Sequence, residues 1–109
     1  MAKVTLFISR AVDQPGHYLV VVNGEGFNGS AGKSVAARVR GDDPWFDDNL
    51  FSIGLGGFHH VLFDGTFSLS QIVPGSELNE DWGRDEIYAL ADVQGLSGSV
   101  KSNVVTGNF

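Results

Sequence analysis

The chain has 109 residues, of which 42% are hydrophobic and 18% are charged, so it holds enough apolar matter for one domain with one core. Thirteen acidic and seven basic side chains give a formal net charge of −6 at pH 7, which opposes approach to nucleic acid or to an anionic membrane surface. Because there is no cysteine, a disulfide framework, a thiolate nucleophile and a cysteine-bound zinc are excluded.

The opening segment, residues 1–10, is basic and then apolar. Its apolar run is shorter than the h-region of a signal peptide, so we expect a protein made in the cytoplasm without an export signal. No stretch of the chain reaches the length of a transmembrane helix. The alternation of apolar and polar residues in this segment predicts a first strand.

Short segments rich in β-branched residues follow between glycine-containing turns. Residues 17–23 form a continuous apolar run that predicts a central strand covered on both sides, and residues 35–40 alternate like a half-buried strand. Asp64-Gly65 predicts a two-residue hairpin turn between strands at 59–63 and 66–72.

Two more strands are predicted at residues 86–92 and 99–106. About seven short strands without an intervening helix indicate an all-β fold, an antiparallel β-sandwich, with a small barrel as the alternative. No internal repeat or linker divides the chain, so we expect residues 1–109 to form a single domain.

Four segments carry a resemblance to a known family. Residues 21–27, Val-Val-Asn-Gly-Glu-Gly-Phe, resemble the second-strand signature of bacterial and phage immunoglobulin-like domains of the IPT/TIG kind. Residues 64–68 with Val73-Pro74 are similar to a later stretch of such domains, and residues 87–95 and 102–105 resemble their last two strands. The resemblance implies an immunoglobulin-like sandwich that serves as a structural spacer, an adhesion module or a virion surface domain. The chain departs from the pattern in its long middle, residues 41–60.

A glycine-rich segment, residues 24–29, satisfies G-x-G-x-x-G, and Gly32-Lys33-Ser34 resembles the end of a phosphate-binding loop. Counted from Gly26, the spacing to Gly32-Lys33-Ser34 is one residue too long, and the residues that follow alternate like a strand where a phosphate loop needs a helix. We therefore interpret the segment as a turn between two strands.

The three histidines, His17, His59 and His60, are candidate metal ligands or catalytic bases. Adjacent residues of a strand point to opposite faces, so His59 and His60 are not expected to share one ion. We expect one of these two to be exposed and the other half-buried.

The acidic segment at residues 42–49 contains four carboxylates, which are hard oxygen ligands suited to calcium. The candidate calcium ligands are Asp42, Asp43, Asp47 and Asp48. Their spacing does not match an EF-hand, so a solvated acidic loop is the alternative interpretation.

Large aromatic side chains accompany the acidic residues. Trp45 and Phe46 lie within the acidic segment, and Trp82 lies in a second acidic segment. Aromatic residues presented by loops favour the centres of interfaces, so these three are the candidate interaction residues. Burial of the same rings against the end of the sandwich is the alternative.

Two functions follow from these observations. The first is a non-enzymatic immunoglobulin-like module that works within a larger assembly, such as a phage virion decoration or tail protein. Its partner would be another protein or further copies of itself in a homo-oligomer, reached through the loop aromatics or through an edge strand at residues 4–9 or 100–105.

The alternative is a calcium-assisted carbohydrate-binding module in which Trp45 stacks on a sugar ring. Calcium is the one cofactor that the sequence suggests. An enzyme is least favoured, because no nucleophile, base and orienting group can be assembled from the sequence.

Overall fold

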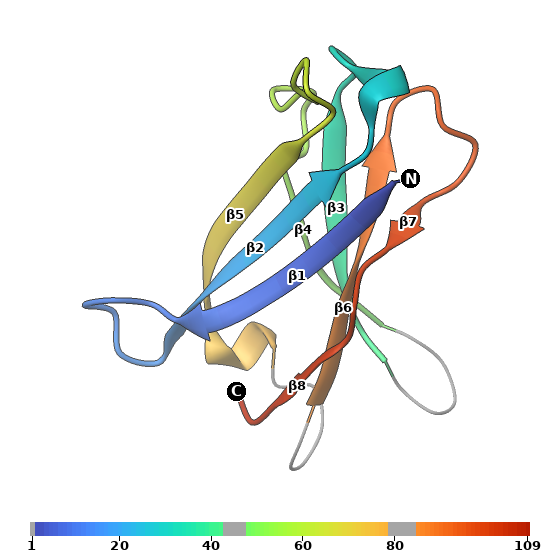
Figure 1. The fold of residues 1–109 in the computed structure, drawn as a ribbon. Coiled ribbons are helices and arrows are strands. Elements are labelled where there is room, and N and C mark those ends of the chain that lie inside the picture. Colours follow the sequence, from blue (N-terminus) through green and yellow to red (C-terminus); the bar gives the residue numbers. More distant parts are fainter. Residues whose placement is uncertain (1, 43–47, 79–84) are drawn as a thin grey trace.

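The computed structural model describes residues 2–42, 48–78 and 85–109, which form two antiparallel sheets packed face to face (Figure 1). The three-stranded sheet contains β1 (Lys3–Arg10), β2 (His17–Glu25) and β5 (Phe67–Pro74). The five-stranded sheet contains β3 (Val35–Gly41), β4 (Asp48–Ile53), β6 (Asp85–Val93), β7 (Val100–Lys101) and β8 (Val105–Gly107). Two 3-10 turns, η1 (Asn28–Ser30) and η2 (Gly75–Glu77), lie in the connections. In the described part of the chain, no helix has the length and hydropathy needed to cross a membrane.

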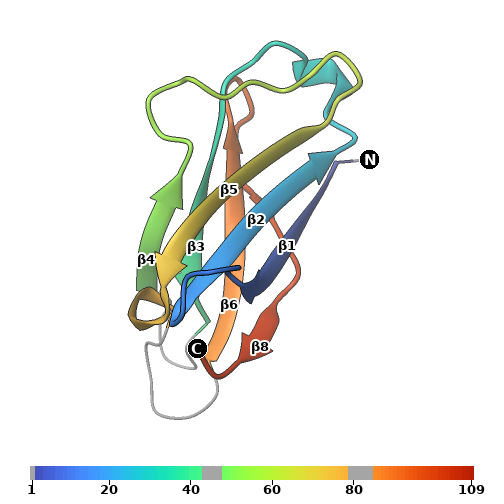
Figure 2. The same ribbon diagram turned by 90° about the vertical axis from the view of Figure 1, so that its left-hand side faces the viewer.

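The strand order is β1-β2-β5 in one sheet and β4-β3-β6 in the other, where β7 and β8 both pair with β6. The chain passes from one sheet to the other between β2 and β3, between β4 and β5, and between β5 and β6 (Figure 2). Such crossings between two antiparallel sheets are typical of immunoglobulin-like sandwiches. The predicted fold class is confirmed, with eight strands among the described residues in place of about seven.

The core lies between the two sheets. In β3, Val35, Ala37 and Val39 are buried while the residues between them are partly exposed, as expected for a strand with one buried face. Val20 and Val22 of β2 are buried in the same way, whereas Leu19 and Val21 on the other face are half-buried, so the prediction of a central strand is confirmed but the prediction that it is covered on both sides is wrong. The largest side chains that are fully buried are Leu6, Leu69, Leu78, Ile87, Val20, Val22, Val35, Val39 and Val73.

Two of the strand predictions are corrected, and one strand was not predicted. Residues 59–63 form a loop, in which an isolated bridge joins His60 to Ser34. Strand β4 was not predicted, because a register shift in its pairing with β3 breaks the alternation that would have marked it. The single strand predicted at residues 99–106 is divided into β7 and β8.

Ser102 and Asn103 cause this division. The N–H of Ser102 donates to the carbonyl of Ala89 in β6 (2.9 Å), and its Oγ accepts from the N–H of Ala89 (2.8 Å). Asn103 bonds to β1 in the other sheet: its Oδ1 accepts from the N–H of Leu6 (2.7 Å) and its Nδ2 donates to the carbonyl of Leu6 (3.2 Å). These neighbouring residues, which we call the Ser102–Asn103 clasp, therefore join β6 of one sheet to β1 of the other.

Gly24 gives the ring of Phe67 its place in the core. The two residues are direct partners in the β2–β5 register, and a Cβ on Gly24 would lie 2.0 Å from the Phe67 ring. The Phe67 ring packs on that of Phe27, with centroids 5.2 Å apart. The chain leaving β2 is thus anchored in the core before it enters the loop that follows.

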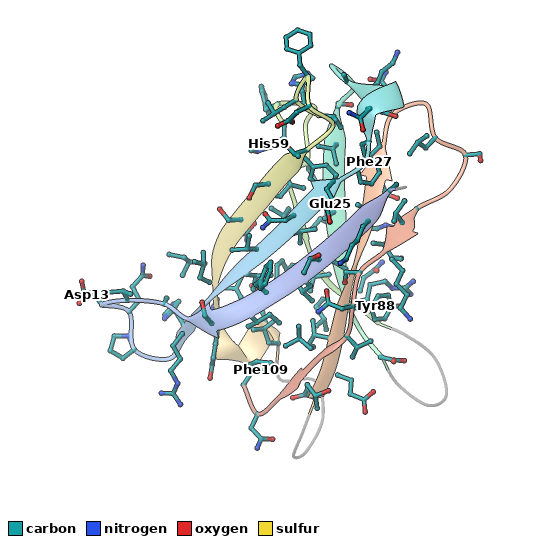
Figure 3. The ribbon with its side chains drawn as sticks, viewed as in Figure 1. Asp13, Glu25, Phe27, His59, Tyr88 and Phe109 are labelled. Atoms are coloured by element: carbon teal, nitrogen blue, oxygen red, sulfur yellow. The ribbon has the colours of Figure 1, made fainter. Side chains whose placement is uncertain are left out.

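The C-terminal residue is also held by packing. The ring of Phe109 meets that of Tyr18 edge to face, with centroids 5.3 Å apart. Phe109 lies at the opposite end of the sandwich from Phe27 and His59 (Figure 3). The C-terminus therefore packs at the end of the sandwich opposite to the end that holds Phe27 and His59.

The clasp predicts a specific loss of stability. Replacing Asn103 by alanine removes both hydrogen bonds to Leu6, and we expect the free energy of unfolding to fall by about 1–3 kcal/mol. Denaturant unfolding of Asn103→Ala measures this change. Asn108→Ala serves as the control, since Asn108 is exposed near the same chain end. Equal losses in the two variants would show that the clasp contributes nothing.

Candidate functional site

Three loops meet at one end of the sandwich (Figure 1). Residues 26–34 join β2 to β3, residues 54–66 join β4 to β5, and residues 94–99 join β6 to β7. We call this the three-loop end. All three loops are among the described residues. Loops at one end of an immunoglobulin-like sandwich are the usual place for binding residues, because the sheets fix their bases.

The loop at residues 54–66 displays large apolar side chains to solvent. Phe63 is 99% exposed, Phe58 is 83% exposed, Leu55 is 69% exposed and Leu62 is 59% exposed. We call these four residues the apolar quartet. Single exposed apolar residues are ordinary, but four on one loop make that loop a candidate interaction site.

A tight turn holds Phe63 at the tip of this loop. The N–H of Gly65 donates to the carbonyl of Leu62 (2.9 Å), and the N–H of Leu62 donates to the carbonyl of Thr66 (2.8 Å). Gly65 has a φ of 79°, whereas Phe63 and Asp64 have negative φ. This is a type I turn followed by a left-handed glycine, so the prediction of a two-residue turn is wrong.

Backbone hydrogen bonds fasten this loop to its neighbour. The N–H of Phe27 donates to the carbonyl of Gly65 (3.0 Å). Further along, the N–H of Gly32 donates to the carbonyl of Val61 (2.8 Å), and the N–H of Val61 donates to the carbonyl of Lys33 (2.9 Å). Leu62 and Phe63 of the apolar quartet therefore lie on a segment whose backbone is hydrogen-bonded to the loop that joins β2 to β3.

Asp64 stabilises the turn through its carboxylate. Its Oδ1 accepts from the hydroxyl of Thr66 (2.6 Å) and from the N–H of Thr66 (3.1 Å). These two hydrogen bonds favour the charged form and lower the pKa of Asp64 below its ordinary value. The polar side of the turn thus fixes the conformation that presents Phe63.

Two hollows adjoin the quartet and share Leu62. One, of about 430 Å³, is lined by Gly32, Val61, Leu62, Phe63 and Asp64. The other is a groove of about 490 Å³ on the outer face of the three-stranded sheet, where Phe7 and Leu62 contribute apolar lining. A partner that covers the tip would therefore meet a continuous, partly apolar surface.

Charge is distributed unevenly between the two ends. Glu25 and Asp64 are the acidic residues in or next to the loops of the three-loop end, apart from Asp92, which is paired. Described acidic residues in or next to the connections of the opposite end are Asp13, Asp42, Asp48, Glu77, Asp85 and Glu86. The three-loop end is the less acidic end within the described residues, which favours it for docking by a chain of net charge −6.

The outer face of the five-stranded sheet is polar. Arg38 forms a bidentate pair with Asp92 (2.9 and 3.1 Å) and also donates to the hydroxyl of Ser99 (2.7 Å). Burial acts to raise the pKa of Asp92, but the hydrogen bonds from Arg38 and Ser99 outweigh it and lower that pKa. A pair this exposed contributes at most about 1 kcal/mol to stability. Lys101 lies over the ring of Tyr88, 4.3 Å from its centroid.

The glycine-rich segment that resembles a phosphate loop is a turn between strands, as predicted. Gly26 and Gly32 have φ values of 77° and 83°, and the short turn η1 lies between them. Strand β3 begins at Val35, where a phosphate loop would require a helix.

The histidines are not brought together as a metal site. His59 and His60 are both exposed, so the expectation that one would be half-buried is wrong. His17 begins β2 at the opposite end. Among residues 2–42, 48–78 and 85–109, no group of three or more potential metal ligands is found.

Most of the predicted calcium and interaction residues lie outside the described part of the chain. These are Asp43, Trp45, Phe46, Asp47 and Trp82. Asp42 is exposed, and its N–H donates to the carbonyl of Glu86 (2.7 Å); Asp48 opens β4. The acidic segment as a calcium site stays a prediction.

The apolar quartet was not predicted as a site. The sequence predicts a strand at residues 59–63, which include Leu62 and Phe63, and it makes no prediction for Leu55 and Phe58. The available signal was the density of glycine around them, since Gly54, Gly56 and Gly57 all have positive φ and prevent a regular strand.

The fold defines the chain as an antiparallel β-sandwich of two sheets, and one of its loops displays large apolar side chains. Comparison with protein-family models, with curated proteins and with solved structures finds no match.

Two substitutions in the turn should differ in their effect on the free energy of unfolding, because Phe63 is displayed by the turn whereas Gly65 forms it. Phe63→Ser should change the free energy of unfolding by less than about 0.5 kcal/mol, because the ring buries almost nothing.

Gly65→Ala should lower the free energy of unfolding by about 1–3 kcal/mol through backbone strain alone. The added Cβ would also lie 2.7 Å from the backbone N of Asn28, which adds to this loss. Denaturant unfolding measures both. A large loss in Phe63→Ser would mean that the ring packs within the protein.

The turn also predicts a titration. Thr66→Val removes one of the two donors and should raise the pKa of Asp64 toward its ordinary value of 3.8, followed by the Asp64 carboxyl ¹³C shift against pH. Because the folded pKa is the lower one, the stability that Asp64 contributes is present above about pH 4 and is lost as the pH falls through the folded pKa. An unchanged pKa in Thr66→Val would contradict this account of the turn.

Proposed function

We propose that the protein is a non-enzymatic interaction module that docks its three-loop end onto a protein partner within a larger assembly. The observation that carries the proposal is the apolar quartet, which is displayed to solvent, and two of its members, Leu62 and Phe63, lie on a segment whose backbone is hydrogen-bonded to the neighbouring loop. Phe58 and Phe63 are more than four-fifths exposed, so they contribute little to the core, and burial against a partner would remove their apolar surface from water.

The energetics of docking favour this surface. Full burial of one large apolar side chain contributes about 1.5–3 kcal/mol. The cost of ordering a flexible loop on binding is small here, since the turn is already fixed by Gly65 and Asp64. Leu62 and the adjoining groove extend the contact onto the outer sheet face.

A protein partner fits this end better than a lipid surface does. Stable attraction to anionic lipid requires a cluster of basic residues, and Lys33 is the single lysine or arginine in the three loops. A virion decoration or tail protein is the assembly that the family resemblance suggests. That choice among assemblies rests on the resemblance and not on the site.

Photocrosslinking tests the proposal in cells that naturally make the protein. A benzoylphenylalanine at position 63 should form a discrete adduct with one protein, and the adduct should weaken when Phe58 and Leu62 are replaced by serine. The matched control carries the same group in place of Val12, which is 84% exposed in the hairpin at the opposite end. Equal labelling from both positions, or none from position 63, would contradict docking through the three-loop end.

A further inference from the structure

Strand β5 is the open edge of the three-stranded sheet. The other edge of that sheet, β1, is tied by the Ser102–Asn103 clasp to the segment between β7 and β8. The two edge strands suggested by the sequence, residues 4–9 and 100–105, therefore face each other. Within the described residues, the backbone of residues 68–73 is paired with β2 alone.

The chemistry of β5 makes its open edge fit for pairing. Its sequence, Phe-Ser-Leu-Ser-Gln-Ile-Val-Pro, contains no charged side chain, although the whole chain carries −6. Exposed edge strands are normally protected from pairing by lysine, a bulge or an internal proline. In β5 the proline is the last residue, and the described pairing with β2 runs without a register shift.

Side-chain exposure shows that the edge is accessible. Ser68, Ser70 and Ile72 point to the outer face and are exposed. Gln71 lies on the inward side, opposite the buried Val20 in the register, yet it too is exposed. The neighbouring layer therefore does not cover this part of β5.

We propose that β5 pairs antiparallel with β5 of a second copy of the chain, which joins two three-stranded sheets into one sheet of six strands. A second copy is favoured as the occupant for an electrostatic reason. Two copies of a chain with a net charge of −6 repel each other, but two β5 strands can meet without like-charge contacts because β5 carries no charged side chain.

The register of this pairing follows from two constraints. Residues directly opposite each other in an antiparallel pair point to the same face of the sheet. The twofold axis between the two β5 strands must therefore place one residue of β5 opposite the same residue of the second copy. Pro74 has no N–H to donate, so the favoured pairing leaves it outside and uses all the remaining residues of β5, 67–73. Ser70 then lies opposite Ser70 of the second copy, and Ile72 lies opposite its Ser68.

The outer sheet face supports the same arrangement. Phe7 and Ile72 are exposed there, and Leu19 and Val21 between them are half-buried. Phe7, Val21 and Ser70 occupy one row across the sheet. Pairing through Ser70 continues this row into the second copy. Because the two β5 strands run in opposite directions, the two three-loop ends face opposite ways, and the dimer carries two docking ends.

Light scattering and sedimentation of the purified chain test the proposal. The unmodified protein should be a dimer that dissociates on dilution. Ser70→Lys should be a monomer, because it places two like charges opposite each other at the twofold axis. Ser9→Lys is the matched control: Ser9 is an exposed serine of the same sheet on β1, and this variant should remain a dimer.

A mixture distinguishes lost pairing from lost folding. Ser70→Lys and Ser70→Glu should each be monomeric alone and should form a heterodimer when mixed. Phe63→Ser should leave the dimer intact, so this proposal does not depend on docking through the three-loop end. The proposal is overturned by an unmodified protein that stays monomeric up to millimolar concentration, by equal effects of Ser70→Lys and Ser9→Lys, or by dissociation in Phe63→Ser.

Discussion

The Ser102–Asn103 clasp connects the two sheets through hydrogen bonds as well as through apolar packing. Ser102 bonds to the backbone of Ala89 on one side, and the Asn103 amide bonds both backbone groups of Leu6 on the other. The clasp satisfies main-chain groups of β1 that would otherwise be exposed at an edge. It covers the β1 edge of the three-stranded sheet, so that the open edge of this sheet lies on the far side, at β5.

Because the clasp and the core hold the two sheets together, the ends of the strands occupy fixed positions. The loops between these ends can therefore hold conformations that their own sequences would not maintain. Phe27 is packed on Phe67 in the core and also bonds to Gly65 of the apolar loop. This one residue links the core to the turn that presents Phe63. The sandwich thus provides the rigidity that lets an apolar side chain remain exposed without collapsing onto the surface.

Much of the fold could be predicted because burial imposes a period of two on a strand with one covered face. That signal is clear in β3, whose predicted range agrees closely with the structure; the range of β6 was also predicted closely, although Ile87, Tyr88 and Ala89 are buried in succession. It failed for β4, where the register shift near Val39 leaves Leu50 and Phe51 both half-buried. It also misled at residues 59–63, because periodicity assigns apolar residues to the core and has no means of marking those that stay outside.

The candidate site was harder to predict than the fold, because its conformation depends on the exact type of turn and on contacts between distant parts of the chain. Asp64-Gly65 indicated a turn, but the dipeptide suits both a two-residue turn and a type I turn with a left-handed glycine, and only the second places Phe63 at the tip. The Asn103 side chain bonds to Leu6, a residue 97 positions away in the chain, so no local pattern could have announced the clasp.

The central claim is that the apolar tip is held rigidly in water by the frame beneath it. Backbone ¹⁵N relaxation of the free protein tests this most directly. The account predicts order parameters of about 0.85 for residues 61–66, equal to those of the strands. Values below about 0.6 in that segment, beside rigid strands, would contradict it, because the apolar quartet would then be a flexible loop without a preformed docking surface.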